Sequence, residues 1–213
     1  MDELHSSKLG TLEFWDQRYE EEKNSFQTHG DPGEIWFGEE SAERVINWLS
    51  NNGIPKNSYI LDVGCGNGMF LIELAREGFS QLFGVDYSQG AIDLAKSIAD
   101  KQEFSSIYYS VENILEGLRG IYDIIHDKGT YDAISQSENP KQNRELYLNS
   151  VFNSLRSDGY FIITSCNWTQ SELDEQFSIK FNTFKVIPTP QFKFGGSVGS
   201  LITTIVYKKK IIE

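Results

Sequence analysis

The sequence predicts a single α/β domain with a mostly parallel β-sheet, and three observations carry this prediction. Short β-branched and aromatic runs alternate with stretches of helical apolar spacing along most of the chain. A glycine-rich turn joins one such run to the helix that follows it. Near the C-terminus, two strand-like runs are joined by a loop with proline and glycine, which indicates a closing antiparallel pair. Because no repeat or linker interrupts the chain, we expect one domain over residues 1–213.

Composition and charge disfavour several classes of function. With 39% hydrophobic and 13% aromatic residues, the chain has the make-up of a globular protein. The net charge of −12 repels phosphate backbones, so we expect no direct binding to nucleic acid and a preference for basic protein partners. The cysteines and histidines show no metal-ligand spacing, so we expect no metal site. No apolar run reaches the roughly 20 residues of a membrane span, and no signal peptide is evident. We therefore expect a cytoplasmic protein without a membrane partner, and we take it to be a monomer.

The first 40 residues are expected to form a cap or lid segment on the domain. Thr11 is a suitable N-cap for a helix that carries three aromatic side chains. A loop over Gly30–Gly38 follows, with Trp36 and Phe37 at its apolar centre. Such a loop either packs into the core or lies over a ligand, and its position alone favours the core.

The remaining elements follow from periodicity and from helix start and stop signals. Ser41 is expected to begin an amphipathic helix that ends near Asn51. Ser88 is expected to cap another helix, and a further helix reaches Leu155 after a polar stretch over residues 135–143. The predicted strands are Tyr59–Val63, Gln81–Asp86, Ile107–Val111, Tyr122–Asp127, Tyr160–Ser165, Phe181–Ile187 and Ser200–Tyr207.

The glycine turn Gly64–Gly68 lies between the first predicted strand and a helix that starts near Met69. Its glycines let the backbone bend sharply and approach a ligand, while the helix start offers free N–H groups. The pattern is one residue short of the dinucleotide fingerprint, in which a pyrophosphate sits on the helix N-terminus. Asp62 stands just before the turn, and a carboxylate there suits a cationic or zwitterionic group such as the methionine part of S-adenosylmethionine. A tight connection without a ligand is the alternative interpretation.

Two further strand ends complete a candidate adenosine site. Asp86 ends the next strand, close to the roughly 20-residue interval at which an acid reaches the ribose hydroxyls. Glu112 and Asn113 close the third strand, where an amide can bind the edge of adenine. Tyr87 is placed to pack on the base. The alternative is that Asp86 is a solvated strand end or helix cap, although Ser88 already supplies a cap.

The segment Asp62–Gly68, with Asp86 and Asn113, resembles the cofactor site of the class I S-adenosylmethionine-dependent methyltransferases. Those enzymes have a Rossmann-like, seven-stranded sheet whose last strands are antiparallel. Nearly the whole chain is similar to a narrower group, the lysine methyltransferases that act on eukaryotic elongation factor 1-alpha. Where that group tends to have an aspartate, this chain has Asn113, whose side-chain oxygen still allows contact with adenine. The stretches that carry the narrower resemblance are Ser7–Thr11, Phe14–Asp16, Gly33–Glu39, Asp127–Ile134, Ile163–Thr169 and Phe192–Ser197.

The resemblance implies a cofactor and a set of residues that bind it. In the family, the segment before the first helix of the domain folds across the cofactor. This favours a lid role for Trp36 and Phe37. The cofactor is expected to be S-adenosylmethionine. The residues expected to bind it are Trp36, Asp62, Gly64, Cys65, Gly66, Asp86, Tyr87, Glu112, Asn113 and Asp127.

A lysine acceptor must lose a proton before it can be methylated. With an ordinary pKa near 10.4, only about one amine in a few thousand is neutral at pH 7. Asp127 and Asp132 are candidate catalytic residues that attract the ammonium and pass its proton to water, while Tyr131 or Trp36 shapes the channel. Lys128 is assigned a structural role. The alternative is that Asp127 only contacts the cofactor backbone and that Asp132 caps a helix.

The sequence therefore predicts a protein-lysine N-methyltransferase that acts on elongation factor 1-alpha. The motif Asp-Lys-Gly-Thr that begins at Asp127 argues against methylation of DNA adenine or glutamine. A small-molecule methyltransferase on the same fold is one alternative, and a binding module without catalysis is another. The intact Asp62, glycine turn and Asp86 weigh against the binding module. An NAD-dependent oxidoreductase is disfavoured, because the glycine interval differs and no partner for hydride transfer is evident.

Overall fold

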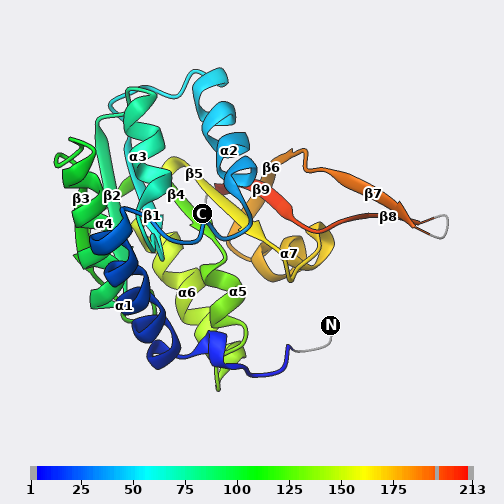
Figure 1. The fold of residues 1–213 in the computed structure, drawn as a ribbon. Helices are drawn as coiled ribbons and strands as arrows, with labels where there is room; N and C mark the ends of the chain where they lie inside the picture. The colour runs from blue at the N-terminus through cyan, green and yellow to red at the C-terminus, as the bar shows by residue number, and fades with distance from the viewer. Residues whose placement is uncertain (1–3, 195–196, 211–213) are drawn as a thin grey trace.

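The strands assemble into one seven-stranded sheet with the order β3-β2-β1-β4-β5-β9-β6 (Figure 1). A computed structural model describes residues 4–194 and 197–210. The first five strands run parallel to their neighbours, and β9 pairs antiparallel with both β5 and β6. The predicted fold class is thereby confirmed. The strands in spatial order are β3 (Tyr108–Val111), β2 (Gln81–Asp86), β1 (Tyr59–Val63), β4 (Tyr122–Lys128), β5 (Leu155–Ser165), β9 (Thr203–Lys209) and β6 (Phe181–Ile187).

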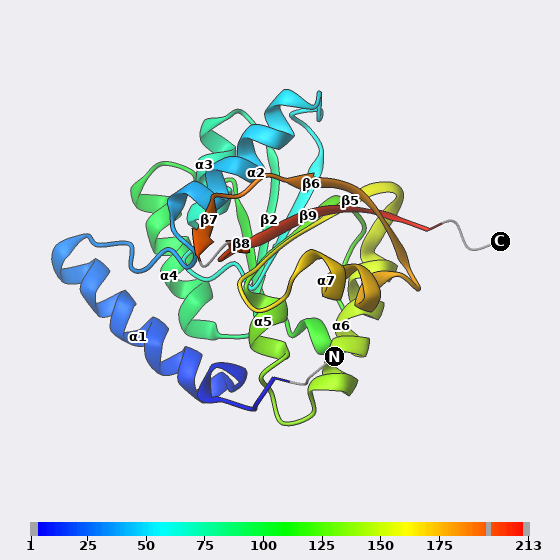
Figure 2. The same ribbon diagram turned by 90° about the vertical axis from the view of Figure 1, so that its right-hand side faces the viewer.

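Helices cover both faces of this sheet (Figure 2). One hydrophobic cluster joins the first face to helices α1 to α4, and a second cluster joins the other face to α5 to α7. Within the described residues, no helix is both long enough and apolar enough to cross a membrane. The helices are α1 (Leu12–His29), α2 (Glu39–Asn51), α3 (Met69–Arg76), α4 (Gln89–Lys101), α5 (Thr130–Ile134), α6 (Pro140–Ser154) and α7 (Gln170–Phe177), with short 3-10 helices η1 (Lys8–Gly10) and η2 (Ile114–Glu116).

Local capping explains where the first helices begin. The Thr11 side chain accepts from the N–H of Phe14, and the Ser88 side chain accepts from the N–H of Ala91, as the sequence predicted. Helix α2 instead begins at Glu39, two residues earlier than expected, because Gly38 adopts a positive φ of 74° and serves as its N-cap. The hydroxyl of Ser41 donates to the carbonyl of Gly38 and therefore lies inside the first turn.

The C-terminal half contains elements that periodicity did not predict. Helix α6 already begins at Pro140, inside the stretch expected to be a polar loop, and Leu155 starts β5 instead of ending the helix. Helix α7 begins with a capping box between Thr169 and Glu172. This local sequence pattern, and not apolar periodicity, indicates the start of the helix. A separate two-stranded sheet, β7 (Gln191–Phe194) and β8 (Ser197–Ser200), extends from the loop between β6 and β9 (Figure 1). The glycines at 195 and 196 lie outside the described residues.

The register between β1 and β4 decides which face each strand-end side chain occupies. Asp62 is paired with His126, and Val63 is paired with Asp127. Because successive side chains of a strand point to opposite faces, Asp62 and His126 share one face while Asp127 lies on the other. The flanking residues agree, since Ile124 packs with the helices of the first face and Ile125 with those of the second.

Candidate active site

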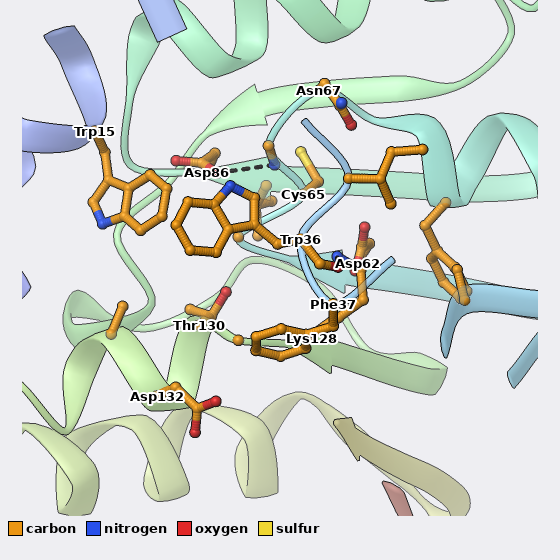
Figure 3. Close-up of a pocket in the computed structure, with 18 of the residues that line it drawn as sticks. Trp15, Trp36, Phe37, Asp62, Cys65, Asn67, Asp86, Lys128, Thr130 and Asp132 are labelled. Atoms are coloured by element: carbon orange, nitrogen blue, oxygen red, sulfur yellow. Dashed lines mark hydrogen bonds between the residues drawn. The ribbon is translucent and has the colours of Figure 1, made fainter. Parts of the chain in front are cut away.

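A cavity of about 800 Å³ lies at the carboxyl ends of the central parallel strands (Figure 3). This is the edge at which open α/β sheets bind ligands, and the volume is typical of small-molecule sites. The cavity brings together residues from α1, the Gly30–Gly38 loop, α2, α3 and the ends of β1 to β5. Of the residues predicted from the sequence, it is lined by Trp36, Asp62, Gly64, Cys65, Gly66, Asp86, Tyr87, Glu112, Asn113 and Asp132, and not by Asp127 or Tyr131.

The glycine turn needs glycine for space as well as for conformation. Gly64 and Gly66 have φ angles of 65° and 53°, in the left-handed region that side chains rarely adopt. A Cβ at Gly64 would collide with the hydroxyl of Thr130, which donates to the carbonyl of Val63 at 2.9 Å. A Cβ at Gly66 would lie only 2.6 Å from the hydroxyl of Tyr19. The turn is therefore packed tightly from behind and presents its backbone to the cavity.

Asp86 is held in place by two backbone N–H groups. Its carboxylate accepts from the N–H of Gly66 at 3.1 Å (Figure 3) and from the N–H of Ser88 at 3.0 Å. Burial raises the pKa of this carboxyl from 3.8 to about 6, while the two N–H groups pull the pKa in the opposite direction. The structure thus brings the second strand-end acid to the glycine turn, with its remaining lone pairs available at the cavity wall.

Asp62 has a buried partner that the sequence analysis missed. The Nδ1 atom of His126 lies 2.7 Å from Oδ1 of Asp62, and both residues are almost fully buried. The His126 ring stacks on Phe70 with a centroid separation of 3.8 Å. In the sequence, the histidines show no metal-ligand spacing, and no local motif singles out His126. Asp62 and His126 both stand near the end of a predicted strand, but their pairing depends on the register between β1 and β4.

At the expected adenine end, the side-chain amide of Asn113 already has local partners. Its oxygen accepts from the N–H of Leu115 at 3.0 Å, and its nitrogen donates to Glu116 at 3.1 Å, so Asn113 caps the helix η2. Glu112 accepts from Ser110 and from the N–H of Arg119. Both residues line the cavity together with Tyr87. Their predicted contacts with adenine stay predictions.

The Gly30–Gly38 loop lines the cavity and is tied to the sheet through its backbone. The ammonium of Lys128 donates to the carbonyl of Trp36 at 2.9 Å, and the amide of Asn67 donates to the carbonyls of Pro32 and Glu34. The Trp36 ring contacts the Trp15 ring edge-on at 5.2 Å. Trp36 is half-buried at the cavity wall and does not belong to either hydrophobic core cluster.

Three residues are predicted to be catalytic: Asp127, Tyr131 and Asp132. Of these, Asp132 alone lines the cavity. The hydroxyl of Ser165 donates to it at 2.5 Å and the N–H of Cys166 at 2.8 Å. Burial raises the pKa of its carboxyl. Cys166 and Asn167, from the end of β5, line the same part of the wall.

Asp127 and Tyr131 lie behind the cavity wall. Asp127 is fully buried and accepts from the hydroxyl of Tyr147 at 2.6 Å and from the N–H groups of Thr130 and Tyr131, each at 3.0 Å. Asp127, and not Asp132, therefore binds the N–H groups at the start of α5. Burial raises the pKa of the Asp127 carboxyl to about 8. The Tyr131 hydroxyl donates to Gln176 at 2.5 Å, away from the cavity.

The cavity wall is strongly acidic. Lys128 is the single basic side chain that lines it in the described part of the chain, and burial lowers the pKa of that lysine. Such a wall favours a cationic ligand over a phosphate. Within the same described ranges, no group of three or more His, Cys, Asp or Glu side chains is placed to hold a metal ion. The acidic lining residues are Glu34, Glu39, Glu43, Asp62, Glu73, Glu77, Asp86, Glu112 and Asp132.

Comparison with known proteins agrees with this geometry. A family model described as a methyltransferase domain matches residues 54–210. The chain is 45% identical over 212 residues to EEF1A lysine methyltransferase 2 of Mus musculus, covering 98% of this chain and 87% of that protein. The chain belongs to the EEF1A lysine methyltransferase family. This methyltransferase is also 36% identical to protein-lysine N-methyltransferase EFM4 of Saccharomyces cerevisiae, covering 98% of this chain and 97% of the yeast protein.

The methyltransferase shares its fold with more distant enzymes. Magnesium protoporphyrin IX methyltransferase of Synechocystis PCC 6803 superimposes with a TM-score of 0.64 at 14% identity, covering 91% of this chain and 97% of that chain. At that identity the likeness concerns the fold alone. Together with the family match, it confirms the class I methyltransferase resemblance seen in the sequence.

Proposed function

We propose that this methyltransferase transfers the methyl group of S-adenosylmethionine to a lysine side chain of elongation factor 1-alpha. The observation that carries the proposal is similarity over nearly the whole chain to relatives whose names state lysine methylation, one of which names EEF1A. Chains this similar over their full length share the fold and the arrangement of the site. The acidic cavity suits both a sulfonium cofactor and a lysine ammonium.

The residues present fit the cofactor. Bound S-adenosylmethionine supplies an electrophilic methyl group on a sulfonium centre. We assign Asp86 to the ribose hydroxyls, because its carboxylate is fixed by the N–H of Gly66 in the glycine turn and by the N–H of Ser88 at the start of α4. Asp62 is assigned to the ammonium of the methionine part, and the backbone of Gly64 and Gly66 to the approach of that part. Tyr87 is assigned to the adenine end.

Asp132 is the residue we assign to the acceptor lysine. It lines the cavity, and the donors from Ser165 and Cys166 fix its orientation without using all of its lone pairs. The raised pKa of its carboxyl makes it a better proton acceptor than an ordinary surface aspartate. After one proton leaves the ammonium, the lysine nitrogen carries a lone pair that would form the new bond to the methyl carbon as the bond between that carbon and sulfur breaks, leaving a neutral thioether.

Asp127 and Tyr131 are assigned a supporting role, in place of the direct role expected from the sequence. Asp127 accepts the first N–H groups of α5, the short helix that carries Asp132. Tyr131 packs against Tyr147 and Phe177 on the side of α5 that faces the core. Both therefore act on the acceptor site by holding α5 against the sheet.

The partner and setting are part of the same proposal. A net charge of −12 supports docking on a basic protein surface and disfavours direct contact with nucleic acid. We further propose that the protein acts in the cytoplasm, as a monomer and without a membrane partner.

The proposal is tested with labelled S-adenosylmethionine and purified elongation factor 1-alpha. Label is expected on the factor, at a lysine identified by mass spectrometry of its peptides. The variant Asp132→Asn is expected to lower kcat by about 100-fold while changing cofactor affinity by less than about threefold. The control variant Asp100→Asn, on the far end of α4 and outside the cavity lining, is expected to behave like the unmodified chain.

Other outcomes separate the alternatives. Label on a different protein in a cell extract, with none on the factor, would overturn the substrate. Label confined to the small-molecule fraction would favour a small-molecule methyltransferase. Tight cofactor binding with no product of any kind would favour a binding module.

A further inference from the structure

We propose that His126 is a positioning residue for the cofactor, which acts by orienting the Asp62 carboxylate. In this arrangement His126 holds Oδ1 of Asp62, and Oδ2 is left for the ammonium group of the ligand's amino-acid part. The inference rests on the proposed function, because it uses Asp62 as the ammonium partner. It adds a residue outside the cavity lining to the binding machinery.

The short contact between the two side chains identifies the proton that lies between them. The Nδ1 atom of His126 is 2.7 Å from Oδ1 of Asp62, a separation typical of a charge-assisted hydrogen bond. With the proton on Nε2 instead, Nδ1 would be an acceptor facing another acceptor. With Asp62 ionised, this geometry assigns the Nδ1–H form to the ring, which donates to the carboxylate.

The other ring nitrogen supports an uncharged ring. The Nε2 atom of His126 is buried and has no hydrogen-bond partner among the residues that the structure describes. An imidazolium would bury a second N–H and a positive charge there without an acceptor, which costs more than an unpaired lone pair. The ring instead stacks on Phe70 at 3.8 Å. Asp62 thus keeps its negative charge for the ligand, because a neutral histidine orients it without cancelling it.

Asp62 has a free side toward the cavity. Within the described chain, no donor is hydrogen-bonded to its Oδ2, although the residue lines the cavity. Its χ rotation is fixed by the bond at Oδ1, so that Oδ2 stays directed without an entropic cost at the moment of binding. The same logic applies to metal sites, where a second partner orients the group that touches the ion.

The proposal makes a statement about ligand class. A ligand with an α-amino group, such as S-adenosylmethionine or S-adenosylhomocysteine, benefits from the oriented Oδ2. A ligand that retains the adenosine and the sulfur but lacks the amino-acid end, such as 5′-methylthioadenosine, does not. Substitution of His126 should therefore change the affinity for the first class and spare the second.

The test measures the dissociation constants of these three ligands by calorimetry for the unmodified chain, His126→Leu and His126→Asn. Leucine and asparagine have the same number of non-hydrogen side-chain atoms, but only asparagine places an N–H near the original Nδ1. His126→Leu is expected to bind S-adenosylmethionine and S-adenosylhomocysteine about tenfold more weakly and methylthioadenosine unchanged. His126→Asn is expected to restore most of the lost affinity. In turnover, KM for the cofactor rises in His126→Leu, while KM for the protein substrate does not.

Several results would overturn the proposal. Equal weakening of all three ligands in His126→Leu would mean a general structural role, and unchanged affinities would mean none. Should His126→Leu fail to fold, the unmodified chain is examined by nitrogen-15 NMR of its histidine rings. An Nε2–H signature for His126 would refute the assigned proton position, whereas an Nδ1–H signature supports it. An unmodified chain that binds none of the three ligands would instead overturn the cofactor assignment of the proposed function.

Discussion

The two ends of the cavity differ in how a strand-end acid is used. At the end that we assign to the cofactor, Asp62 is the penultimate residue of β1 and Asp86 ends the neighbouring β2, and both line the cavity. At the acceptor end, Asp127 stands at the end of β4 in the same way, yet its carboxylate is fully buried on the opposite face. The cause is an offset of one residue between the two acids. Asp62 is paired with His126, and Asp127 is paired with Val63, so the two carboxylates point to opposite faces of the sheet. An acid at the end of a strand therefore indicates a binding site only when its side chain points to the face of the sheet from which the cavity is reached.

The largest effect is expected from Asp127→Ala. This variant distinguishes a role of Asp127 in folding stability from a direct role in catalysis. The change leaves the Tyr147 hydroxyl and two N–H groups of α5 without their buried acceptor. We expect a loss of about 3–5 kcal/mol in the free energy of unfolding, and a Tm lower by about 10 °C. Thermal unfolding followed by circular dichroism measures this. Cofactor affinity of the folded fraction should stay close to normal.

An opposite result for Asp127→Ala would restore the direct catalytic role that the sequence suggested. That result is a normal Tm combined with a complete loss of turnover. Asp127→Asn is the matched control, because its remaining oxygen has two lone pairs and can still accept some of these hydrogen bonds. Its loss of stability should be smaller than that of the alanine variant.

The next largest effect is expected from Asp86→Ala, at the cofactor end. Loss of two charge-assisted hydrogen bonds to the ribose should weaken cofactor binding by about 10- to 100-fold. Calorimetric titration with S-adenosylhomocysteine measures the change. Asp16→Asn is the control, since Asp16 accepts from Ser88 beside the same turn but does not line the cavity. Equal losses in both variants would argue that Asp86 acts only through the fold.

Trp36→Ala should have a smaller effect and tests the lid. Cofactor affinity is expected to fall by about tenfold, with less than about 1 kcal/mol lost in unfolding free energy. The reason is that Trp36 is half-buried at the cavity wall, while the bond from Lys128 uses its backbone oxygen and survives the change. Phe14→Ala, which alters a neighbouring aromatic ring outside the cavity, is the control. A normal affinity combined with a much lower Tm would favour the core interpretation.

The smallest effect concerns pH and again contrasts affinity with stability. Burial raises the pKa of Asp86 from 3.8 to about 6, so the folded state binds this proton more tightly than the unfolded state. The stability contributed by this proton is fully present below pH 4 and is lost as pH rises through 6. Ribose binding needs the anionic carboxylate, so cofactor affinity should fall several-fold from pH 7 to pH 5.

Asp86→Asn is expected to flatten the pH profile of cofactor affinity and to reduce the slope of the stability profile, because the amide does not titrate while the buried Asp127 still does. Unfolding in urea and cofactor titration at pH 5, 6 and 7 measure the two curves side by side. A cofactor affinity that keeps its pH dependence in Asp86→Asn would assign that dependence to another group.

The residues that we assign to the cofactor lie at the strand ends and turn that the sequence predicts, because the signals for those elements are local. The glycine spacing, the strand that ends in Asp86 and the cap at Ser88 all lie within short windows, and each is found where it was expected. The acceptor end depends on the register between β1 and β4 and on α5, a helix of five residues that is too short to show periodicity. The partnership of His126 with Asp62 joins strands 64 residues apart in the sequence, so no local pattern records it.

The attachment of the Gly30–Gly38 loop has a consequence for the substitutions that the loop tolerates. Asn67 and Lys128 hold the loop through the carbonyl oxygens of Pro32, Glu34 and Trp36. Every amino acid carries a backbone carbonyl oxygen, so these hydrogen bonds do not depend on which side chains occupy positions 32, 34 and 36. Exchange of side chains in that segment can therefore alter this wall of the cavity, while Asn67 and Lys128 keep the loop backbone in place.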